Sequence, residues 1–210
     1  MNSAGNPNDQ WDVFLPLKQF AAGKSRLSTI PDDFRVSLIK AMAIDLVEVL
    51  LQIPQVTTIT IVGVDHTQLT SAANSRLKSF PILEPIDINS DLQLAMGESK
   101  RIAIFLPDLP SVKAVEILRA LALASTNRTS FIADHNSIGS TAFFSTVGKV
   151  ATHFGINSAA AHRSAGAIEL IDPQFKGIKA DCDDWSDLLA IAANDLGHAT
   201  RALMEHHLQN

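Results

Sequence analysis

"RIAIFLPDLPSV", residues 101–112, joins an apolar run to a polar loop that contains two prolines. Its apolar first half, 101–106, is typical of a buried strand, and Pro107 ends that strand because proline cannot donate to a sheet. Asp108 then lies between two prolines, whose stiff backbone suits a carboxylate that must hold one direction. The alternative is that Asp108 ends the strand or caps the helix that we predict at 111–125.

The same alternation of strand and helix continues on both sides of this stretch. We predict strands at 12–17, 56–64 and 129–134, and a long amphipathic helix at 32–53 that begins after Pro31 with two acids. Strands that alternate with helices indicate an α/β fold, a mostly parallel sheet flanked by helices. Without an internal repeat or linker, residues 11–210 are expected to form a single domain that follows a disordered tail, 1–10.

The composition bounds the class of protein. The 210 residues are 46% hydrophobic and 19% charged, as in an ordinary soluble domain. A net charge of −5 argues against nucleic-acid and anionic-membrane partners. The single cysteine, Cys182, excludes an internal disulfide, the N-terminus lacks the apolar core of a signal peptide, and no uncharged apolar run reaches the about 18 residues that span a bilayer. We expect a cytoplasmic enzyme.

Four polar side chains directly follow the predicted strands, namely Lys18, Asp65, Asp108 and Asp134. In open α/β sheets, ligands bind beyond the carboxyl ends of the strands. We therefore expect the functional site among these residues and the loops that carry them, ahead of the outer helix faces.

Residues 23–25, Gly-Lys-Ser, match the end of a P-loop, but the spacing excludes that motif. A P-loop needs a glycine five residues earlier, where the backbone curls around the phosphates, and this chain has Lys18 there. A lysine cannot replace a glycine that must bring bare backbone against an anion. What remains is a loop with three cations, Lys18, Lys24 and Arg26. Lys24 and Arg26 could equally be solvated charges on a connector.

Four aspartates crowd the segment "KADCDDWSDL", residues 179–188. Asp184 and Asp187 have the spacing of a helix N-cap and its N3 partner. A cap does not explain Asp181 and Asp183, which point the same way in extended backbone and repel each other unless a cation lies between them. Oxygen donors of this kind favour Mg²⁺ shared with a substrate phosphate.

Two further polar loops are predicted at 133–145 and 153–170. In the second, Gly155 precedes a helix for which Ser158 is the expected cap, which is either an anion site or an ordinary capped helix. The seven histidines show no metal-ligand spacing, and we expect His162 to be structural. Together, the basic loop, the strand-end acids and this helix start indicate metal-assisted chemistry on a nucleoside triphosphate.

Five segments then resemble, in order, the motifs of one enzyme family. They are "PLKQFAAGKSRL" (16–27), "PDLPSV" (107–112), "SFIADHNSIGSTAFF" (130–144), "FGINSAAAHRSAGAIEL" (154–170) and "ADCDDWSDL" (180–188). The family is that of the CofC/FbiD guanylyltransferases, relatives of the MobA-like nucleotidyltransferases with a GT-A-like fold. The resemblance covers roughly residues 12–190, and "HRSAGAIEL" is most similar to the actinobacterial branch.

The resemblance implies a reaction in coenzyme F420 biosynthesis: GMP passes from GTP to phosphoenolpyruvate, and pyrophosphate leaves. 2-Phospho-L-lactate and 3-phosphoglycerate remain alternative acceptors, and a non-catalytic protein that binds GTP or the phosphoacid is the alternative from another class. A nucleotidyltransferase for a sugar phosphate or a molybdopterin-type cofactor is disfavoured because its glycine-rich opening is missing. The implied partner is the downstream deazaflavin-transferring enzyme.

The resemblance also implies roles for single residues. Mg²⁺ would be held by Asp108, Asp181 and Asp183, the phosphoacid by Lys18, Thr141, Gly155 and Ser158, and the GTP triphosphate by Lys24 and Arg26; the catalytic cations would be Lys18, Lys24 and Arg26.

Two positions depart from the family pattern. Leu92-Gln93 replaces a Leu-Asn step near the nucleotide base, a change that bears on the base preference. Asp184-Trp185 adds a negative charge beside the metal ligands.

Overall fold

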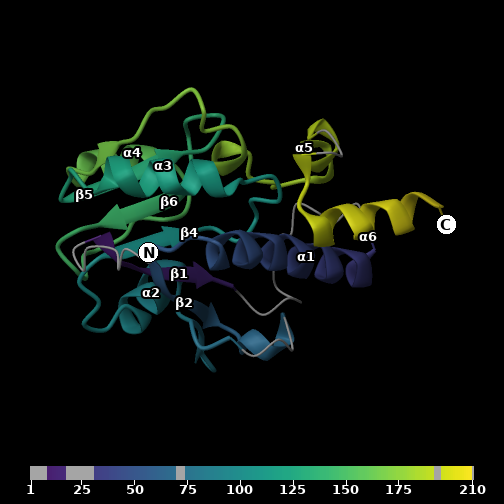
Figure 1. The fold of residues 1–210 in the computed structure, drawn as a ribbon, viewed down its shortest axis with the longest axis horizontal. Helices are drawn as coiled ribbons and strands as arrows, with labels where there is room; N and C mark the ends of the chain where they lie inside the picture. The colour runs from purple at the N-terminus through teal and green to yellow at the C-terminus, as the bar shows by residue number, and fades with distance from the viewer. Residues whose placement is uncertain (1–8, 18–30, 70–73, 192–194, 210) are drawn as a thin grey trace, which may run out of the picture.

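A computed structural model describes residues 9–17, 31–69, 74–191 and 195–209 of the chain (Figure 1). Within these ranges, seven strands form one sheet in the order β3-β2-β1-β4-β6-β5-β7. The strands are β1 (Trp11–Pro16), β2 (Val56–Gly63), β3 (Leu77–Pro81), β4 (Ile102–Phe105), β5 (Thr129–Ala133), β6 (Ser140–Ser145) and β7 (Ile168–Glu169). The predictions for the tail 1–10 and for a single domain at 11–210 stay predictions.

All strands except β6 run in the same direction. β1 pairs in parallel with β2 and β4, β2 with β3, and β5 with β7, whereas β6 is antiparallel to both β4 and β5. This confirms the predicted mostly parallel sheet, and the four predicted strands lie within one residue of their predicted ends. The prediction of a polar loop over 133–145 was wrong for its second half, because Ser140–Ser145 is a fully buried strand of the sheet.

Helices cover both faces of the sheet. They are α1 (Asp32–Leu51), α2 (Ile88–Ala95), α3 (Ala114–Ala124), α4 (Ser158–Ser164), α5 (Trp185–Ala190) and α6 (His198–Gln209), with short 3-10 turns η4 (His66–Gln68) and η5 (Gly177–Lys179). The helices predicted at 32–53 and 111–125 are confirmed, each slightly shorter than predicted. Of the helices in the described part of the chain, none has the length and apolar character to cross a membrane.

Alternating side chains divide the core into two layers, since neighbouring residues of a strand point to opposite faces. Val13 and Leu15 of β1 pack in the layer beneath α1, α3 and α6, whereas Phe14 packs in the layer beneath α2 and α4. In β4, Ala103 and Phe105 belong to the first layer in the same way. Burial on both faces explains why these strands read as continuous apolar runs in the sequence.

The C-terminal helix α6 lies along α1 (Figure 1) and is joined to it by a buried carboxylate. Asp45 of α1 is 4% exposed, and its two oxygens accept the backbone N–H groups of Ala199 and Thr200 at 2.7 and 2.9 Å. These N–H groups lie in the first turn of α6, where no intrahelical acceptor exists, so a side chain of α1 caps α6. A Cβ atom at Gly197 would lie 2.2 Å from Asp45 Cγ, so the contact also requires glycine.

We predict that Asp45→Asn destabilises the protein by about 2–3 kcal/mol, because the amide turns an N–H donor toward a backbone N–H that has lost its acceptor. Urea unfolding measures the effect. Glu48→Gln, on the exposed side of the same helix, is the control and should change stability by less than about 0.5 kcal/mol. Equal stability of the two variants would contradict the capping role.

Candidate active site

The carboxyl ends of the parallel strands meet at one edge of the sheet, and Asp108 lies there directly beyond β4. The backbone N–H of Leu106 donates to the carbonyl of Thr141 at 2.8 Å, which brings the start of β6 beside the loop that carries Asp108. Asp108 is 7% exposed and Thr141 is fully buried. Two residues predicted from distant motifs therefore lie on adjacent strands.

A backbone hydrogen bond joins the acidic segment to Asp108. The N–H of Cys182 donates to the Asp108 carbonyl at 3.0 Å, and the Cys182 side chain is buried. Asp181 and Asp183, both half-buried, flank this anchored residue. The structure thus places all three predicted magnesium ligands on two segments that are in direct contact.

The described residues contain no group of three or more acidic, histidine or cysteine side chains arranged as a metal cage. Mg²⁺ rarely uses such a cage, because it is commonly bound by one or two carboxylates together with substrate phosphates and water. The carboxylates of Asp108, Asp181 and Asp183 supply oxygen donors from joined segments, so the residues present fit Mg²⁺ bound in that way.

The carboxylate of Glu116, in the first turn of α3, holds these two segments in place. It is 4% exposed, and its oxygens accept the N–H groups of Lys113 at 2.8 Å, Lys176 at 2.7 Å and Gly177 at 2.8 Å, with Ile178 at 3.4 Å. Lys113 ends the loop after Asp108, and residues 176–178 lead to Asp181. One buried charge, satisfied by backbone donors from both sides, therefore fixes both approaches to the acidic residues.

We predict that Glu116→Gln lowers stability by about 2 kcal/mol, since the side-chain amide nitrogen cannot accept one of the backbone N–H groups. Chemical unfolding measures the loss. Hydrogen exchange should show faster opening either of the Lys113 amide, which bonds to one carboxylate oxygen, or of the amides at 176–178, which bond to the other. Glu205→Gln, exposed on α6, is the matched control. Unchanged exchange both at Lys113 and at 176–178 would contradict the anchoring role.

Several acids near the site turn out to stabilise local structure. The predicted cap of α5 is confirmed: Asp184 Oδ1 accepts the N–H of Asp187 at 3.0 Å, and Asp187 Oδ2 accepts those of Asp183 and Asp184 at 2.9 and 3.0 Å. This accounts for the charge at Asp184, and it fixes the backbone at Asp183. Asp65 caps η4 through Thr67, so it acts as a turn residue.

The β5–β6 connection is organised by Asp134, whose two oxygens accept the N–H groups of Ile138 at 2.9 Å and Gly139 at 2.7 Å. Asp134 is therefore a loop-forming residue rather than a candidate ligand. The next residue, His135, was not predicted: its Nδ1 lies 3.4 Å from Asp181 Oδ1. Only the fold brings these two residues together, and no local sequence pattern indicated it.

Ser158 is not the cap of α4, contrary to the prediction. Asn157 occupies the N-cap position with a left-handed backbone (φ 57°), and Ser158 is the first helical residue. The Ser158 hydroxyl instead accepts a hydrogen bond from Ser140 Oγ at 2.8 Å. Gly155 begins this turn at φ +131°, a conformation that favours glycine.

A buried hydrogen-bond chain sets the direction of the Ser158 hydroxyl. His162 Nε2 accepts the N–H of His153 at 3.0 Å, so Nδ1 carries the proton of the neutral ring and donates to Ser140 Oγ at 3.0 Å. Ser140 then donates to Ser158, which leaves the Ser158 proton available as a donor. Burial first, and the neighbouring His153 second, lower the pKa of His162 to about 4, which keeps the ring neutral. The structural role expected for His162 is confirmed.

We predict that this histidine makes stability depend on pH. Its pKa is lower in the folded protein (about 4) than the ordinary 6.5, so the stabilisation is complete above pH 6.5 and is lost as the pH falls toward 4. The difference corresponds to about 3 kcal/mol. Between pH 7 and 4.5, the free energy of unfolding should depend less on pH in His162→Gln than in the parent protein. In His198→Gln, a variant of an exposed histidine, it should depend on pH as in the parent. Parallel curves for the parent and His162→Gln would contradict this.

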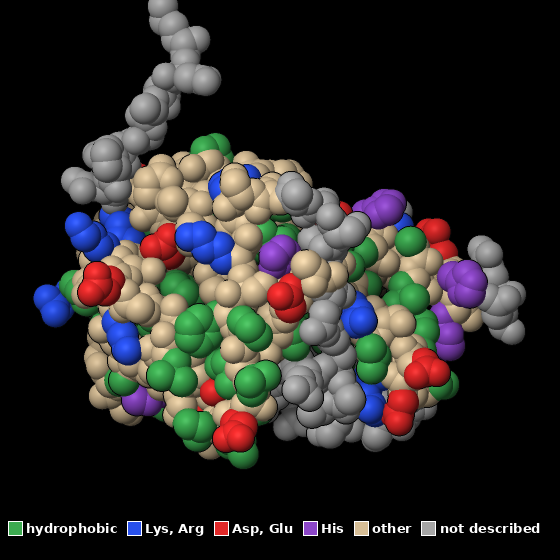
Figure 2. Space-filling model, turned by 90° about the horizontal axis from the view of Figure 1, so that it is seen from below, with side chains coloured by type: hydrophobic (Ala, Val, Ile, Leu, Met, Phe, Trp, Pro, Cys, Tyr) green, Lys and Arg blue, Asp and Glu red, His purple; other side chains and the backbone are tan. Residues whose placement is uncertain are grey.

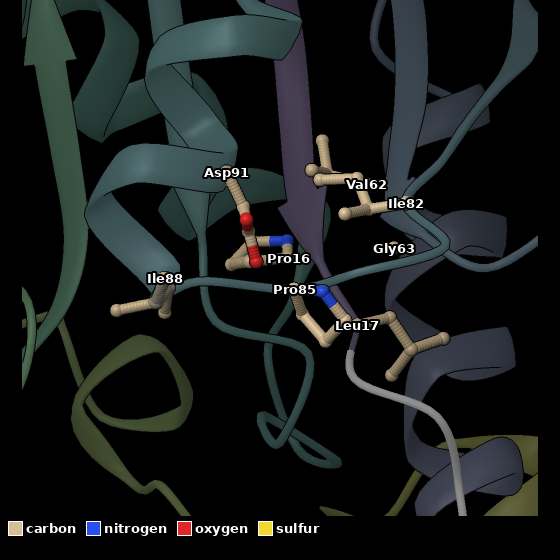
Figure 3. A pocket seen from close by; sticks show the side chains of 8 residues that line it. All are labelled: Pro16, Leu17, Val62, Gly63, Ile82, Pro85, Ile88 and Asp91. Carbon is tan, nitrogen blue, oxygen red and sulfur yellow. The ribbon is translucent and has the colours of Figure 1, made fainter.

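A narrow pocket, called the slot below, opens beyond the ends of β1 and β2 (Figure 3). It contains about 420 Å³ of space, part of it open to solvent. Figure 3 shows Asp91 of α2 pointing into it toward Pro16. On the side of the molecule seen in Figure 2, hydrophobic side chains gather on the surface. The slot is lined by Pro16, Leu17, Val62, Gly63, Ile82, Pro85, Ile88 and Asp91.

Gln93, which the sequence places near the nucleotide base, is not among the residues that line the slot. Its amide nitrogen donates to the carbonyl of Val150, and the preceding Leu92 is fully buried. The Leu-Gln step therefore braces α2, and it does not present an amide to the slot. The predicted cations Lys18, Lys24 and Arg26 lie outside the described residues; Leu17, the last described residue before them, lines the slot.

A family model for guanylyl transferases of the CofC-like type matches residues 11–201, nearly the whole chain. The chain belongs to this family.

Curated relatives support the assignment over almost their full length. The chain is 31% identical over 204 residues to the phosphoenolpyruvate guanylyltransferase of Mycolicibacterium paratuberculosis, covering 92% of each chain. It is 28% identical over 194 residues to the enzyme of the same name from Mycolicibacterium vanbaalenii, covering 88% of this chain and 90% of that one.

Solved structures confirm the nucleotidyltransferase fold. A putative nucleotide-diphospho-sugar transferase from Desulfovibrio desulfuricans superposes with a TM-score of 0.67 at 15% identity, covering 93% of this chain and 94% of that one. A 4-diphosphocytidyl-2C-methyl-D-erythritol synthase from Anaerococcus prevotii gives 0.56 at 6% identity, with 94% and 97% covered. At these identities the likeness concerns the fold, in agreement with the GT-A-like prediction.

Proposed function

We propose that this chain transfers GMP from GTP to phosphoenolpyruvate and releases pyrophosphate. The hydrogen bond between Cys182 and Asp108 carries the proposal, because it brings the paired acids 181 and 183 to the end of β4, in a chain of the CofC-like family. The two relatives described above are named for this activity. The reaction needs a site of this kind, with acids beside a nucleotide pocket.

Charge repulsion is the main physical problem of the reaction. The phosphate oxygen of the acceptor attacks the α-phosphorus of GTP, and both partners are anions. Two unit charges 4 Å apart interact by about 4 kcal/mol at an effective dielectric near 20. The acceptor phosphate is already ionised, so no general base is needed, and the protein contributes mainly orientation and charge compensation.

Asp108, Asp181 and Asp183 would hold Mg²⁺ in this proposal. When bound, Mg²⁺ supplies positive charge against the phosphate oxygens and helps to orient them. Lys24 and Arg26 would face the GTP triphosphate, as the sequence motif indicates. The carboxylates would thus bind the metal ion, and the cations would face the phosphates directly.

On the acceptor side, we assign Lys18, Thr141, Gly155 and Ser158 to the phosphoacid. Ser158 presents a hydroxyl proton as a donor, set by the chain from His162. The buried Thr141 hydroxyl has no hydrogen-bond partner within the part of the chain that the structure describes. Two hydroxyl donors close to the end of β4 support an anionic acceptor here.

The cellular context also belongs to this proposal. A cytoplasmic location agrees with the single, buried Cys182. The product joins a nucleoside monophosphate to a reactive phosphoacid, so we propose that the downstream deazaflavin-transferring enzyme takes it directly as its substrate.

We predict that Asp108→Ala and Asp183→Ala each lower kcat by at least about 10²-fold while the protein stays folded, because each removes a charged contact that the reaction requires. Pyrophosphate release from GTP, Mg²⁺ and phosphoenolpyruvate measures the loss, and circular dichroism checks the fold. Glu98→Ala, an exposed acid after α2, is the control. Normal turnover in either variant would contradict the proposal that the substituted aspartate binds Mg²⁺.

The acceptor is tested by the same assay with phosphoenolpyruvate, 2-phospho-L-lactate and 3-phosphoglycerate in parallel. The downstream enzyme is included as a trap for an unstable product. Release that depends on GTP and phosphoenolpyruvate is the expected result. Pyrophosphate release with another acid alone would keep the reaction class and change the acceptor. No release with any of the three acids would reject the proposed function.

A further inference from the structure

The slot has the composition of a site for a flat, partly polar ring. Seven of its eight lining residues are apolar or glycine, and Asp91 is the charged one. Small-molecule sites are mostly apolar with a few placed polar groups, and the slot has this composition. Val62 and Gly63 end β2, the neighbour of β1 on the side away from β4, so the slot lies on the side of β1 away from Asp108.

Contacts on both sides of α2 hold Asp91 in its direction. The N–H of Ile86 donates to Asp91 Oδ1 at 3.3 Å, from the segment that leads into the helix. Asn89, two residues earlier in the helix, accepts the N–H of Phe154 at 2.8 Å, and Gln93, two residues later, donates to Val150. Residues two apart on a helix point away from each other. Anchoring of Asn89 and Gln93 to residues 150–154 therefore directs Asp91 toward the slot.

We propose that Asp91 is the residue that selects guanine, by accepting the N1–H and N2–H groups of the base seated in the slot. The inference rests on the proposed function and names its base-specificity residue. A carboxylate accepts only, and its two oxygens match two neighbouring donors in a bidentate arrangement. The oxygen bonded to Ile86 keeps capacity for a further hydrogen bond, since a carboxylate offers about four acceptor positions.

The chemistry of the bases makes this arrangement selective. Guanine presents two adjacent donors on this edge, whereas adenine presents one donor and, at N1, an acceptor that a carboxylate repels. Xanthine replaces the guanine N2 amino group by an oxygen, which the carboxylate also repels. A site that is built to accept specific N–H groups rejects analogues without them more strongly than an apolar pocket rejects a missing methylene.

The test is a change of Asp91 to asparagine with GTP, ATP and xanthosine triphosphate as substrates. Asparagine keeps the shape, accepts from N1–H with its oxygen and donates from its amide to the xanthine oxygen. In Asp91→Asn, we expect kcat/KM for pyrophosphate release with phosphoenolpyruvate to fall at least about 10²-fold with GTP. The same quantity should rise at least about 10-fold with xanthosine triphosphate. ATP should stay poor with both proteins. An unchanged ratio of GTP to xanthosine triphosphate would overturn the proposal.

Two further variants separate base selection from structural damage. Asp91→Ala removes the acceptor without adding a donor. Its kcat/KM with GTP should therefore fall, and its kcat/KM with xanthosine triphosphate should not rise. Asp33→Asn makes the same chemical change in the first turn of α1 and should leave the ratio unchanged. A gain with xanthosine triphosphate in Asp91→Ala, or a shifted ratio in Asp33→Asn, would overturn the proposal.

Equilibrium binding of GTP and xanthosine triphosphate to the parent and Asp91→Asn proteins keeps the test independent of turnover. If the parent protein binds GTP but no acceptor supports turnover, the proposed reaction fails, and the shift of binding preference in Asp91→Asn still decides the role of Asp91. Binding of GTP and ATP with equal affinity by the parent protein would overturn guanine selection directly.

Discussion

The buried carboxylate of Glu116 is the interaction on which the geometry of the acidic residues depends. A charge removed from water is tolerated only when hydrogen bonds replace its hydration, and here backbone donors come from two segments about 60 positions apart in the chain. The N–H of Cys182 closes the same arrangement by bonding to the Asp108 carbonyl. Because all of these partners are backbone groups, the arrangement fixes the course of the chain at Asp108 and at the acidic segment 181–183.

The order of the strands places three features of the candidate site in a line along one edge of the sheet. The slot lies beyond β1 and β2, Asp108 follows the adjacent β4, and Ser140, which supports Ser158, begins β6 on the other side of β4. The slot, the acidic residues and the Ser140–Ser158 pair thus occupy successive positions along this edge. The one antiparallel strand is essential to this order, because reversal of β6 brings its first residues, rather than its last, to the edge where the parallel strands end.

The sequence was sufficient to predict an element wherever the interactions that form it are local. Continuous apolar runs predicted β1, β2, β4 and β5, and the spacing of Asp184 and Asp187 predicted the cap of α5. It was insufficient for β6, since Ser140 finds its partners in Ser158 and His162, 18 and 22 residues away. The capping of α6 by Asp45 and the contact of His135 with Asp181 are equally long-range. Asp91 resembles any acid in the first turn of a helix, and only the slot distinguishes it.

The burial of Cys182 has a practical consequence. The chain has a single thiol, which lies in the core at 1% exposure, and a thiol without solvent access reacts slowly with alkylating reagents. A second cysteine introduced at an exposed position such as Leu83, in the segment between β3 and α2, would therefore be the preferred target of a maleimide dye. Such labelling therefore does not require removal of the native cysteine, and a dye at this position would test whether a nucleotide enters the slot.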